Sequence, residues 1–190
     1  MDGNYGTERT DELVLAESLT SPHQFSLLLR RHGDRLNSYM ARRVGQQTAE
    51  DLSATLWLQA FESRRDFDAT RGTVVGWLYG IARHQISRYR RTAGRRLRAI
   101  AQLGGREKLR ADAQPRIVDE AIAAVDLNAV LDALSALSNE DREILELFVW
   151  EQLSYEEIAQ VLGLRLGTVK SRLSRARGRL TNNLRSSVAP

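Results

Sequence analysis

Residues 154–172 read SYEEIAQVLGLRLGTVKSR, and this stretch decides the fold of the last third of the chain. Ser154 with Glu157 three residues later is the pattern of a capping box, which begins a helix. Gly163 is the residue type that ends a helix, because it adopts a positive φ without strain. A second helix is expected over residues 167–180. Two short helices joined by a tight turn predict a helix-turn-helix.

The second helix is apolar on one side and basic on the other. We expect a core between the two helices, built from Ile158, Leu164, Val169 and Leu173. Ala159 is small enough for a close crossing. The opposite face carries Thr168, Lys170, Ser171, Arg172, Arg175 and Arg179, and residues 167–190 contain no acid. Such a helix fits the major groove of duplex DNA, where Arg and Lys reach guanine edges or phosphates. A solvated Arg-rich helix, or one that docks on an acidic protein, is the alternative.

The composition agrees with a polyanionic partner. The chain has 190 residues, a formal charge of +4 and a pI of about 9.8. Its length favours two small domains over one. The absence of cysteine excludes disulfides, thiolate catalysis and Cys-ligated metals. No signal sequence and no long apolar run is present, so we expect a soluble, cytoplasmic protein.

Helical periodicity also dominates the N-terminal part of the chain. Apolar residues recur at three- and four-residue steps from Phe25 to Met40, from Ala49 to Phe61 and from Val74 to Tyr89. Ser21 is a candidate cap for the first of these helices, with Pro22 in its first turn. A loop is expected over residues 63–73.

We therefore predict an all-α protein of two small helical domains. The domains are expected at residues 10–92 and 118–186, and a flexible linker, part of it helical, at residues 93–117. In the second domain, a helix containing Leu134 and Leu137 is expected to end before Ser138. Ser138 with Asp141 resembles another capping box, which begins the next helix.

Aromatic and basic side chains gather between the second and third helices. The aromatic residues are Trp57, Phe61, Phe67, Trp77, Tyr79 and Tyr89, and the basic ones that follow are Arg83, Arg88, Arg90 and Arg91. Single-stranded DNA needs this combination, because unstacked bases bind ring faces and phosphates bind cations. Taken singly, each aromatic residue is more often core than stacking platform, and Trp77 is expected in the core.

Three stretches, taken together, indicate one function for the two halves of the chain. They are AEDLSATLWLQAF at residues 49–61, GWLYGIAR at residues 76–83 and GTVKSRLSRAR at residues 167–177. In this order they resemble a bacterial RNA polymerase sigma factor of the extracytoplasmic function (ECF) group of the sigma-70 family. The first is similar to the polymerase-binding helix, the second to the promoter-melting helix and the third to the recognition helix. The resemblance covers nearly all of residues 22–182.

The resemblance implies a transcription initiation factor and not an enzyme. Its implied partners are core RNA polymerase, promoter DNA and an anti-sigma factor, with no small-molecule substrate, cofactor or metal. On the polymerase, the implied docking points are the clamp helices of the largest catalytic subunit and the flap of the second-largest subunit. The implied polymerase-binding residues are Asp51, Leu52, Thr55, Leu56 and Gln59.

The resemblance also assigns the DNA contacts. A base flipped from the melted minus-ten strand would enter the loop at residues 66–73. The implied minus-ten residues are Asp66, Phe67, Asp68, Arg71, Arg83, His84, Arg88 and Arg91. The duplex minus-thirty-five element would be read by Arg165, Thr168, Lys170, Ser171, Arg172, Ser174, Arg175 and Arg177, of which Arg165 and Arg177 are assigned to phosphates.

The chain departs from the family pattern at three places. The usual DLVQETF is DLSATLW at residues 51–57, His84 stands where the family usually has Asn, and Arg165 replaces the usual Ser cap of the recognition helix. Losing that cap costs about 1 kcal/mol. A cation at the positive end of a helix is also unfavourable, and a DNA phosphate there would relieve both effects.

Two other classes of protein remain as alternatives. An ordinary helix-turn-helix regulator would bind its operator without polymerase, as a symmetric dimer. An enzyme is poorly supported, because His23, His32 and His84 show no metal or triad spacing and no phosphate-binding loop is present. His32 is expected to be a hydrogen-bonded core residue.

Overall fold

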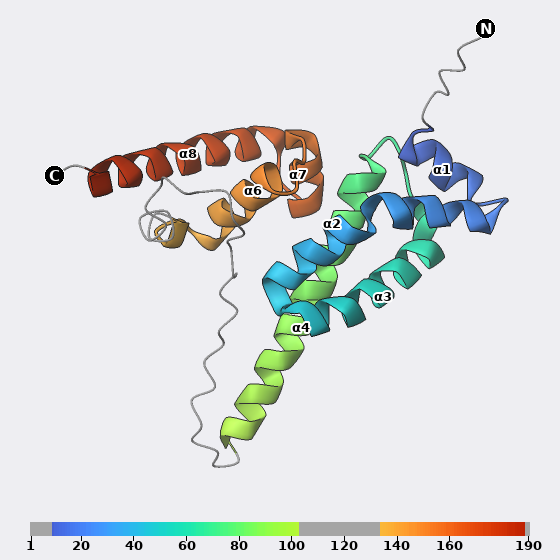
Figure 1. The fold of residues 1–190 in the computed structure, drawn as a ribbon, viewed down its shortest axis with the longest axis horizontal. Helices are drawn as coiled ribbons and strands as arrows, with labels where there is room; N and C mark the ends of the chain where they lie inside the picture. The colour runs from blue at the N-terminus through green and yellow to red at the C-terminus, as the bar shows by residue number, and fades with distance from the viewer. Residues whose placement is uncertain (1–8, 103–133, 189–190) are drawn as a thin grey trace, which may run out of the picture. The chain divides into compact units, whose positions relative to one another are not determined.

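The computed structural model describes residues 9–102 and 134–188. The chain divides into two compact units, residues 1–115 and 116–190. Every regular element of the described residues is helical (Figure 1), which confirms the all-α prediction there. None of the described helices is both long and apolar enough to cross a membrane.

The first unit is built on three long helices, α2 (Ser26–Val44), α3 (Gln46–Ser63) and α4 (Val74–Gln102), which pack on one another. Gly45, at a φ of 85°, makes the sharp turn between α2 and α3. Tyr39 of α2 and Tyr79 of α4 meet edge to face at 5.1 Å in the core. The fully buried side chains of this core include Leu28, Leu36, Met40, Leu56 and Leu78.

A short helix, α1 (Asp11–Glu17), precedes the bundle and was not foreseen. The Thr10 hydroxyl accepts a hydrogen bond from the backbone N–H of Leu13, and two acids follow it in the first turn. The chain then enters α2 through the 3-10 turn η1 (Pro22–Phe25). Ser21 makes no side-chain capping bond, contrary to expectation. Because η1 leads directly into α2, the chain is already helical where a cap would act.

Helix α4 extends well beyond its apolar pattern, which stops near Tyr89. Residues 93–102, the first part of the expected linker, are helical. Arg is among the better helix formers and residues 93–102 contain no proline, so the helix continues beyond the apolar pattern. The remainder of the expected linker lies outside the described residues.

The second unit contains α6 (Asn139–Val149), α7 (Tyr155–Leu162) and α8 (Leu166–Val188). Before α6, residues 134–135 are helical, as expected, but Leu137 lies beyond the end of that helix, where it is buried. The Ser138 hydroxyl accepts from the N–H of Asp141 at the start of α6. The capping box of Ser154 and Glu157 is complete, with both reciprocal hydrogen bonds formed. The core joins all three helices through Ile144, Leu147, Ile158, Val169 and Leu173.

Candidate nucleic-acid interface

The turn between α7 and α8 has the geometry that the sequence predicts. Gly163 ends α7 in the left-handed conformation, at a φ of 65° and a ψ of 34°. The N–H of Leu164 then bonds back to the carbonyl of Ala159 at 3.0 Å. The carbonyl of Arg165 accepts from the N–H groups of Thr168 and Val169, so α8 starts at once. Leu164 is only half-buried, unlike the other three expected core residues.

Helix α8 separates its apolar and basic residues as expected. Val169, Leu173 and Ala176 are buried against α6 and α7. Of the predicted minus-thirty-five residues, Thr168 and Arg172 are half-buried, and the exposed ones are Arg165, Lys170, Ser171, Ser174, Arg175 and Arg177. The basic face is therefore open within the second unit.

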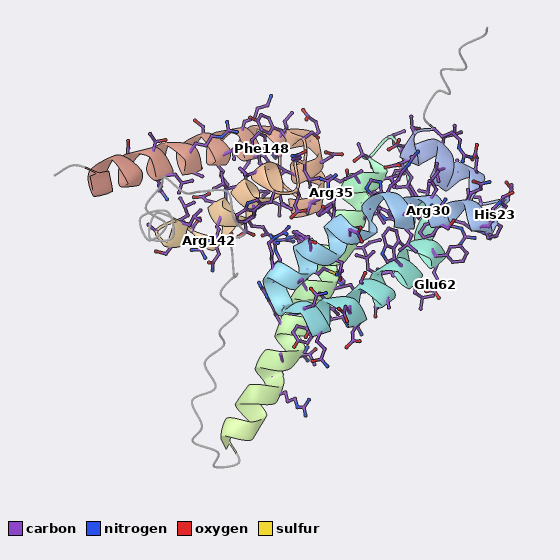
Figure 2. The ribbon with its side chains drawn as sticks, in the orientation of Figure 1. His23, Arg30, Arg35, Glu62, Arg142 and Phe148 are labelled. Carbon is purple, nitrogen blue, oxygen red and sulfur yellow. The ribbon has the colours of Figure 1, made fainter. Side chains whose placement is uncertain are left out.

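Helix α6 supplies acids and an aromatic ring to the basic helix, and sequence reasoning missed them. Arg172 forms an ion pair with Glu140, and this hydrogen bond raises the pKa of Arg172. Arg179 lies 3.7 Å from the carboxylate of Asp141. The guanidinium of Arg177 lies 4.5 Å from the ring centre of Phe148, a residue of α6 that is labelled in Figure 2. The sequence analysis gave Asp141 only a capping role, with Ser138, and gave Glu140 none.

The predicted minus-ten loop packs on α4. The rings of Phe67 and Trp77 lie 5.5 Å apart, and both residues are half-buried, so Trp77 is less deeply placed than expected. The Asp68 carboxylate accepts from the hydroxyl and the N–H of Thr70. These two bonds lower the pKa of Asp68. Asp66, Asp68 and Arg71 are exposed.

The basic residues of α4 follow the loop along one helix. His84, Arg88 and Arg91 are exposed, whereas Arg83 is half-buried. Arg91 donates to the Ser87 hydroxyl at 3.1 Å. The predicted minus-ten residues therefore lie at the end of the 3-10 turn η2 (Arg64–Asp66), on the loop after it and on α4.

The predicted polymerase-binding residues of α3 do not share one exposed face. Asp51 and Thr55 are exposed and Leu52 is half-buried, but Leu56 is fully buried. The side-chain oxygen of Gln59 accepts from the amide of Gln85 in α4, at 2.6 Å. Leu56 and Gln59 therefore hold α3 in the bundle, and the fully buried side chain of Leu56 is not placed for a surface contact. Sequence spacing alone did not show which face of α3 turns inward.

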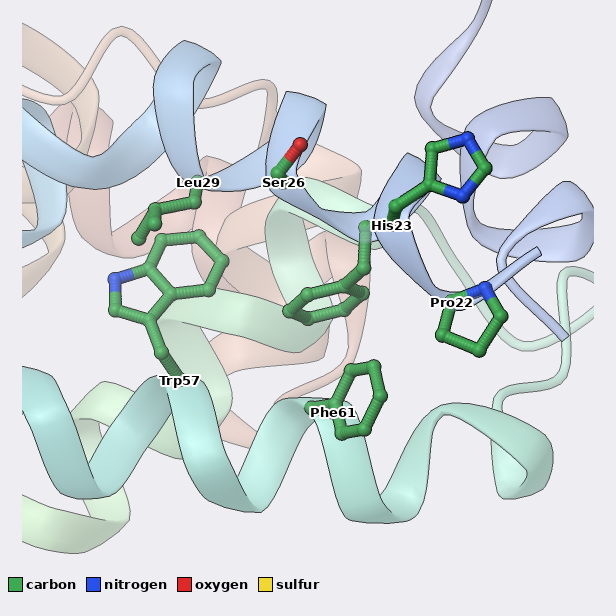
Figure 3. A pocket seen from close by; sticks show the side chains of 7 residues that line it. Pro22, His23, Ser26, Leu29, Trp57 and Phe61 are labelled. Atoms are coloured by element: carbon green, nitrogen blue, oxygen red, sulfur yellow. The ribbon is translucent and has the colours of Figure 1, made fainter.

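An apolar pocket of about 250 Å³ lies beside α3 (Figure 3). Trp57 and Phe61 form one wall, and both rings contact Phe25 of η1 edge to face. The other lining residues are Pro22, His23, Ser26 and Leu29. Trp57 and Phe61 thus pack inside the first unit, and both are still partly exposed at its surface.

His32 is a satisfied, partly buried histidine, as expected. Its Nε2 lies 2.5 Å from the carboxylate of Asp11 in α1. No group of three acidic, histidine or cysteine side chains in the described stretches is arranged to hold a metal ion.

Comparison with known proteins assigns both units. Residues 28–96 match the family model of sigma-70 region 2, and residues 127–180 match that of sigma-70 region 4. The chain belongs to the sigma-70 family of transcription initiation factors, which are not enzymes. Within that family it is an ECF sigma factor.

The chain covers different shares of its relatives' lengths. The chain is 35% identical over 159 residues to the ECF RNA polymerase sigma factor SigE of Mycolicibacterium smegmatis, covering 83% of this chain and 60% of SigE. It is 29% identical over 162 residues to the RNA polymerase sigma factor YlaC of Bacillus subtilis, covering 84% of this chain and 91% of YlaC.

Two solved structures share the fold. RpoE of Bartonella quintana, solved with the anti-sigma factor NepR, is 27% identical with a TM-score of 0.61, and the match covers 85% of this chain and 96% of RpoE. CnrH, solved with the cytosolic domain of CnrY, is 23% identical with a TM-score of 0.61, and the match covers 93% of this chain and 97% of CnrH.

Proposed function

We propose that this chain binds core RNA polymerase and directs it to promoters in the bacterial cytoplasm. The second unit would read the minus-thirty-five element as duplex through the exposed basic face of α8. The first unit would hold the minus-ten element as a melted strand, with a flipped base in the loop at residues 66–73. The observation that carries this proposal is the open basic face of α8 over Lys170 and Arg175, which is free of acidic side chains on its own helix.

On the polymerase, the first unit would dock on the clamp helices through the exposed part of α3. Asp51, Leu52 and Thr55 are the residues that we retain for this contact. The second unit would bind the flap of the second-largest subunit. An anti-sigma factor is a further partner, supported by the complex of RpoE with NepR.

Transcription from purified components tests the proposal. The full chain with core polymerase should give specific initiation from some members of a promoter library, and core polymerase alone should give none. The chain alone should shift duplex promoter DNA only weakly in a gel. Tight binding of a symmetric operator without polymerase would instead support a helix-turn-helix regulator. Absence of initiation by well-folded protein would contradict the sigma-factor proposal.

A charge-reversed variant sharpens the test. Lys170→Glu places an acid on the exposed face of α8 without touching the buried face. Initiation that needs the minus-thirty-five element should be lost, because phosphates repel a carboxylate. The control is the same reversal at exposed Arg30 of α2, outside the predicted DNA contacts.

A further inference from the structure

Two neighbouring carboxylates of α1 reach two different helices. Asp11 accepts from Arg31 of α2 at 2.7 Å and pairs with His32 of the same helix. Glu12 points to α4, where its Oε1 accepts from the backbone N–H of Val74 at 3.2 Å. The short N-terminal helix thus connects α2 with the first residue of α4.

The start of α4 has few other ways to satisfy its backbone. The first N–H groups of a helix have no partner within the helix. At this end the Thr73 hydroxyl accepts from the N–H of Gly76 at 3.0 Å, and Glu12 takes that of Val74. Val74 is fully buried, so water does not reach it while the fold is intact. A carboxylate is also favoured at the positive end of the helix dipole.

The loop at residues 66–73 ends directly at this cap. Phe67, near its beginning, packs on Trp77 in the first turn of α4, and Thr73 is its last residue. Both ends of the loop are therefore held by the same turn of helix. The position of that turn fixes the path of the loop.

We infer that Glu12 is a positioning residue for the minus-ten loop: by accepting the Val74 N–H it fixes where α4 begins and so preorganises the loop to receive a flipped base. The inference rests on the proposed function of the loop. Preorganisation matters here, because a loop that must first be ordered lowers the affinity for its ligand.

The first measurement uses the full chain alone. Amide hydrogen exchange at residues 66–78 should rise about tenfold in Glu12→Ala, because a buried donor loses its acceptor. Glu12→Gln should retain most of the protection, since the amide oxygen can accept the same bond. Glu17→Gln, a change on the same helix at the residue that pairs with Arg9, should leave the exchange at residues 66–78 unchanged.

The second measurement uses the holoenzyme formed with core polymerase. Open-complex dissociation is compared on an intact promoter and on templates in which an abasic site is moved through the minus-ten element. Glu12→Ala should weaken the complex about tenfold on the intact promoter. The penalty should vanish on the template whose missing base weakens the wild-type complex most, because no base is left for the loop to hold.

Each other outcome has a distinct meaning. Equal losses on intact and abasic templates would overturn the positioning role and leave Glu12 as a general stabiliser of the fold. If Glu12→Ala speeds hydrogen exchange at residues 66–78 but leaves open-complex dissociation unchanged, the positioning role is also overturned. It is overturned as well if Glu12→Ala leaves the exchange at these residues unchanged. If wild-type holoenzyme forms no open complex on any template, the proposed function fails with the inference, and hydrogen exchange then reports a structural cap only.

Discussion

Arg175 and Arg177 lie two residues apart on α8 but in different surroundings. Arg175 is exposed, and its Nε donates to the backbone carbonyl of Ser171 at 3.4 Å. We expect Arg175→Ala to lower promoter binding by about 1 to 3 kcal/mol in a sequence-dependent way, if the side chain touches a base edge. Competition between promoter variants, measured with the holoenzyme, checks this. Equal losses on every promoter would show a phosphate contact instead.

Arg177 should behave as a phosphate contact. The ring of Phe148 holds its guanidinium, which restricts how far it can reach into a groove. Arg177→Ala should weaken binding to all promoters equally and reduce the salt dependence by about one phosphate. Arg177→Lys, which keeps the charge, should retain the salt dependence. A loss confined to some sequences would contradict this assignment.

We expect Glu140, which pairs with Arg172, to compete with DNA for that guanidinium. Because the carboxylate neutralises the guanidinium, Glu140→Gln should raise the affinity of the holoenzyme for promoter DNA, and most at low salt. Glu156→Gln, at an exposed position of α7, is the control. Fluorescence anisotropy over a range of salt concentrations measures the effect. Unchanged affinity would show that Arg172 does not meet DNA.

We predict that Asp11 contributes to the free energy of unfolding in a way that depends on pH. The hydrogen bond with His32, helped by Arg31, lowers the pKa of this carboxyl below its usual 3.8 although burial opposes the shift. A depressed pKa means that the contribution is present above the unfolded-state value and is lost as the pH falls through the folded-state value. Asp11→Asn should therefore flatten the loss of stability below about pH 4, measured by urea unfolding at several pH values. Parallel pH profiles would contradict it.

Helix α7 ends because a glycine lies at its C-terminus. A Cβ at Gly163 would meet no atom within 4 Å, so the cost of Gly163→Ala is that of the positive φ alone. We expect a loss of about 1 kcal/mol in the free energy of unfolding, and a smaller loss for Gly163→Asn. Gly178→Ala, in the middle of α8 with equal space, should stabilise by about 1 kcal/mol. Thermal unfolding compares the three variants.

Elements with a local signal could be predicted from the sequence. The capping box at Ser154 and the glycine at position 163 act over a few residues, and both were found where the pattern indicated. The end of α4 had no such signal, because Arg-rich sequence is compatible with both helix and linker. Helix α1 was missed although Thr10 and the two acids after it form a local start signal. The bonds of those acids to Arg31 and Val74 depend on tertiary packing and have no signal in the sequence.

The candidate site was predictable to the same extent. A basic face is visible from spacing, so the exposure of most of the named α8 residues could be predicted, while their contacts with DNA stay a prediction. The burial of Leu56 and the bond between Gln59 and Gln85 depend on how α3 packs, which the spacing leaves open. The acids of α6 that meet Arg172 and Arg179 likewise depend on tertiary packing.

At the scale of the whole molecule, each unit has its own hydrophobic core. Leu36 is fully buried in the first unit and Ile144 in the second. Leu36→Ala should destabilise its unit by about 2 to 5 kcal/mol and leave hydrogen-exchange protection in the second unit unchanged. Ile144→Ala should do the reverse. Loss of protection in both units from either change would show that they unfold as one.

The bonds that α1 makes to α2 and α4 also limit which changes the gene can tolerate in the α1 segment. Successive residues of a helix are rotated by about 100°, as 3.6 residues per turn require. A single-codon deletion between Glu12 and the buried residues Val14 and Leu15 would turn both carboxylates away from their partners or expose the apolar pair. Substitutions at the outward-facing Leu13 and Ala16 leave that arrangement intact. Related genes should therefore accumulate point changes in this segment far more readily than insertions or deletions.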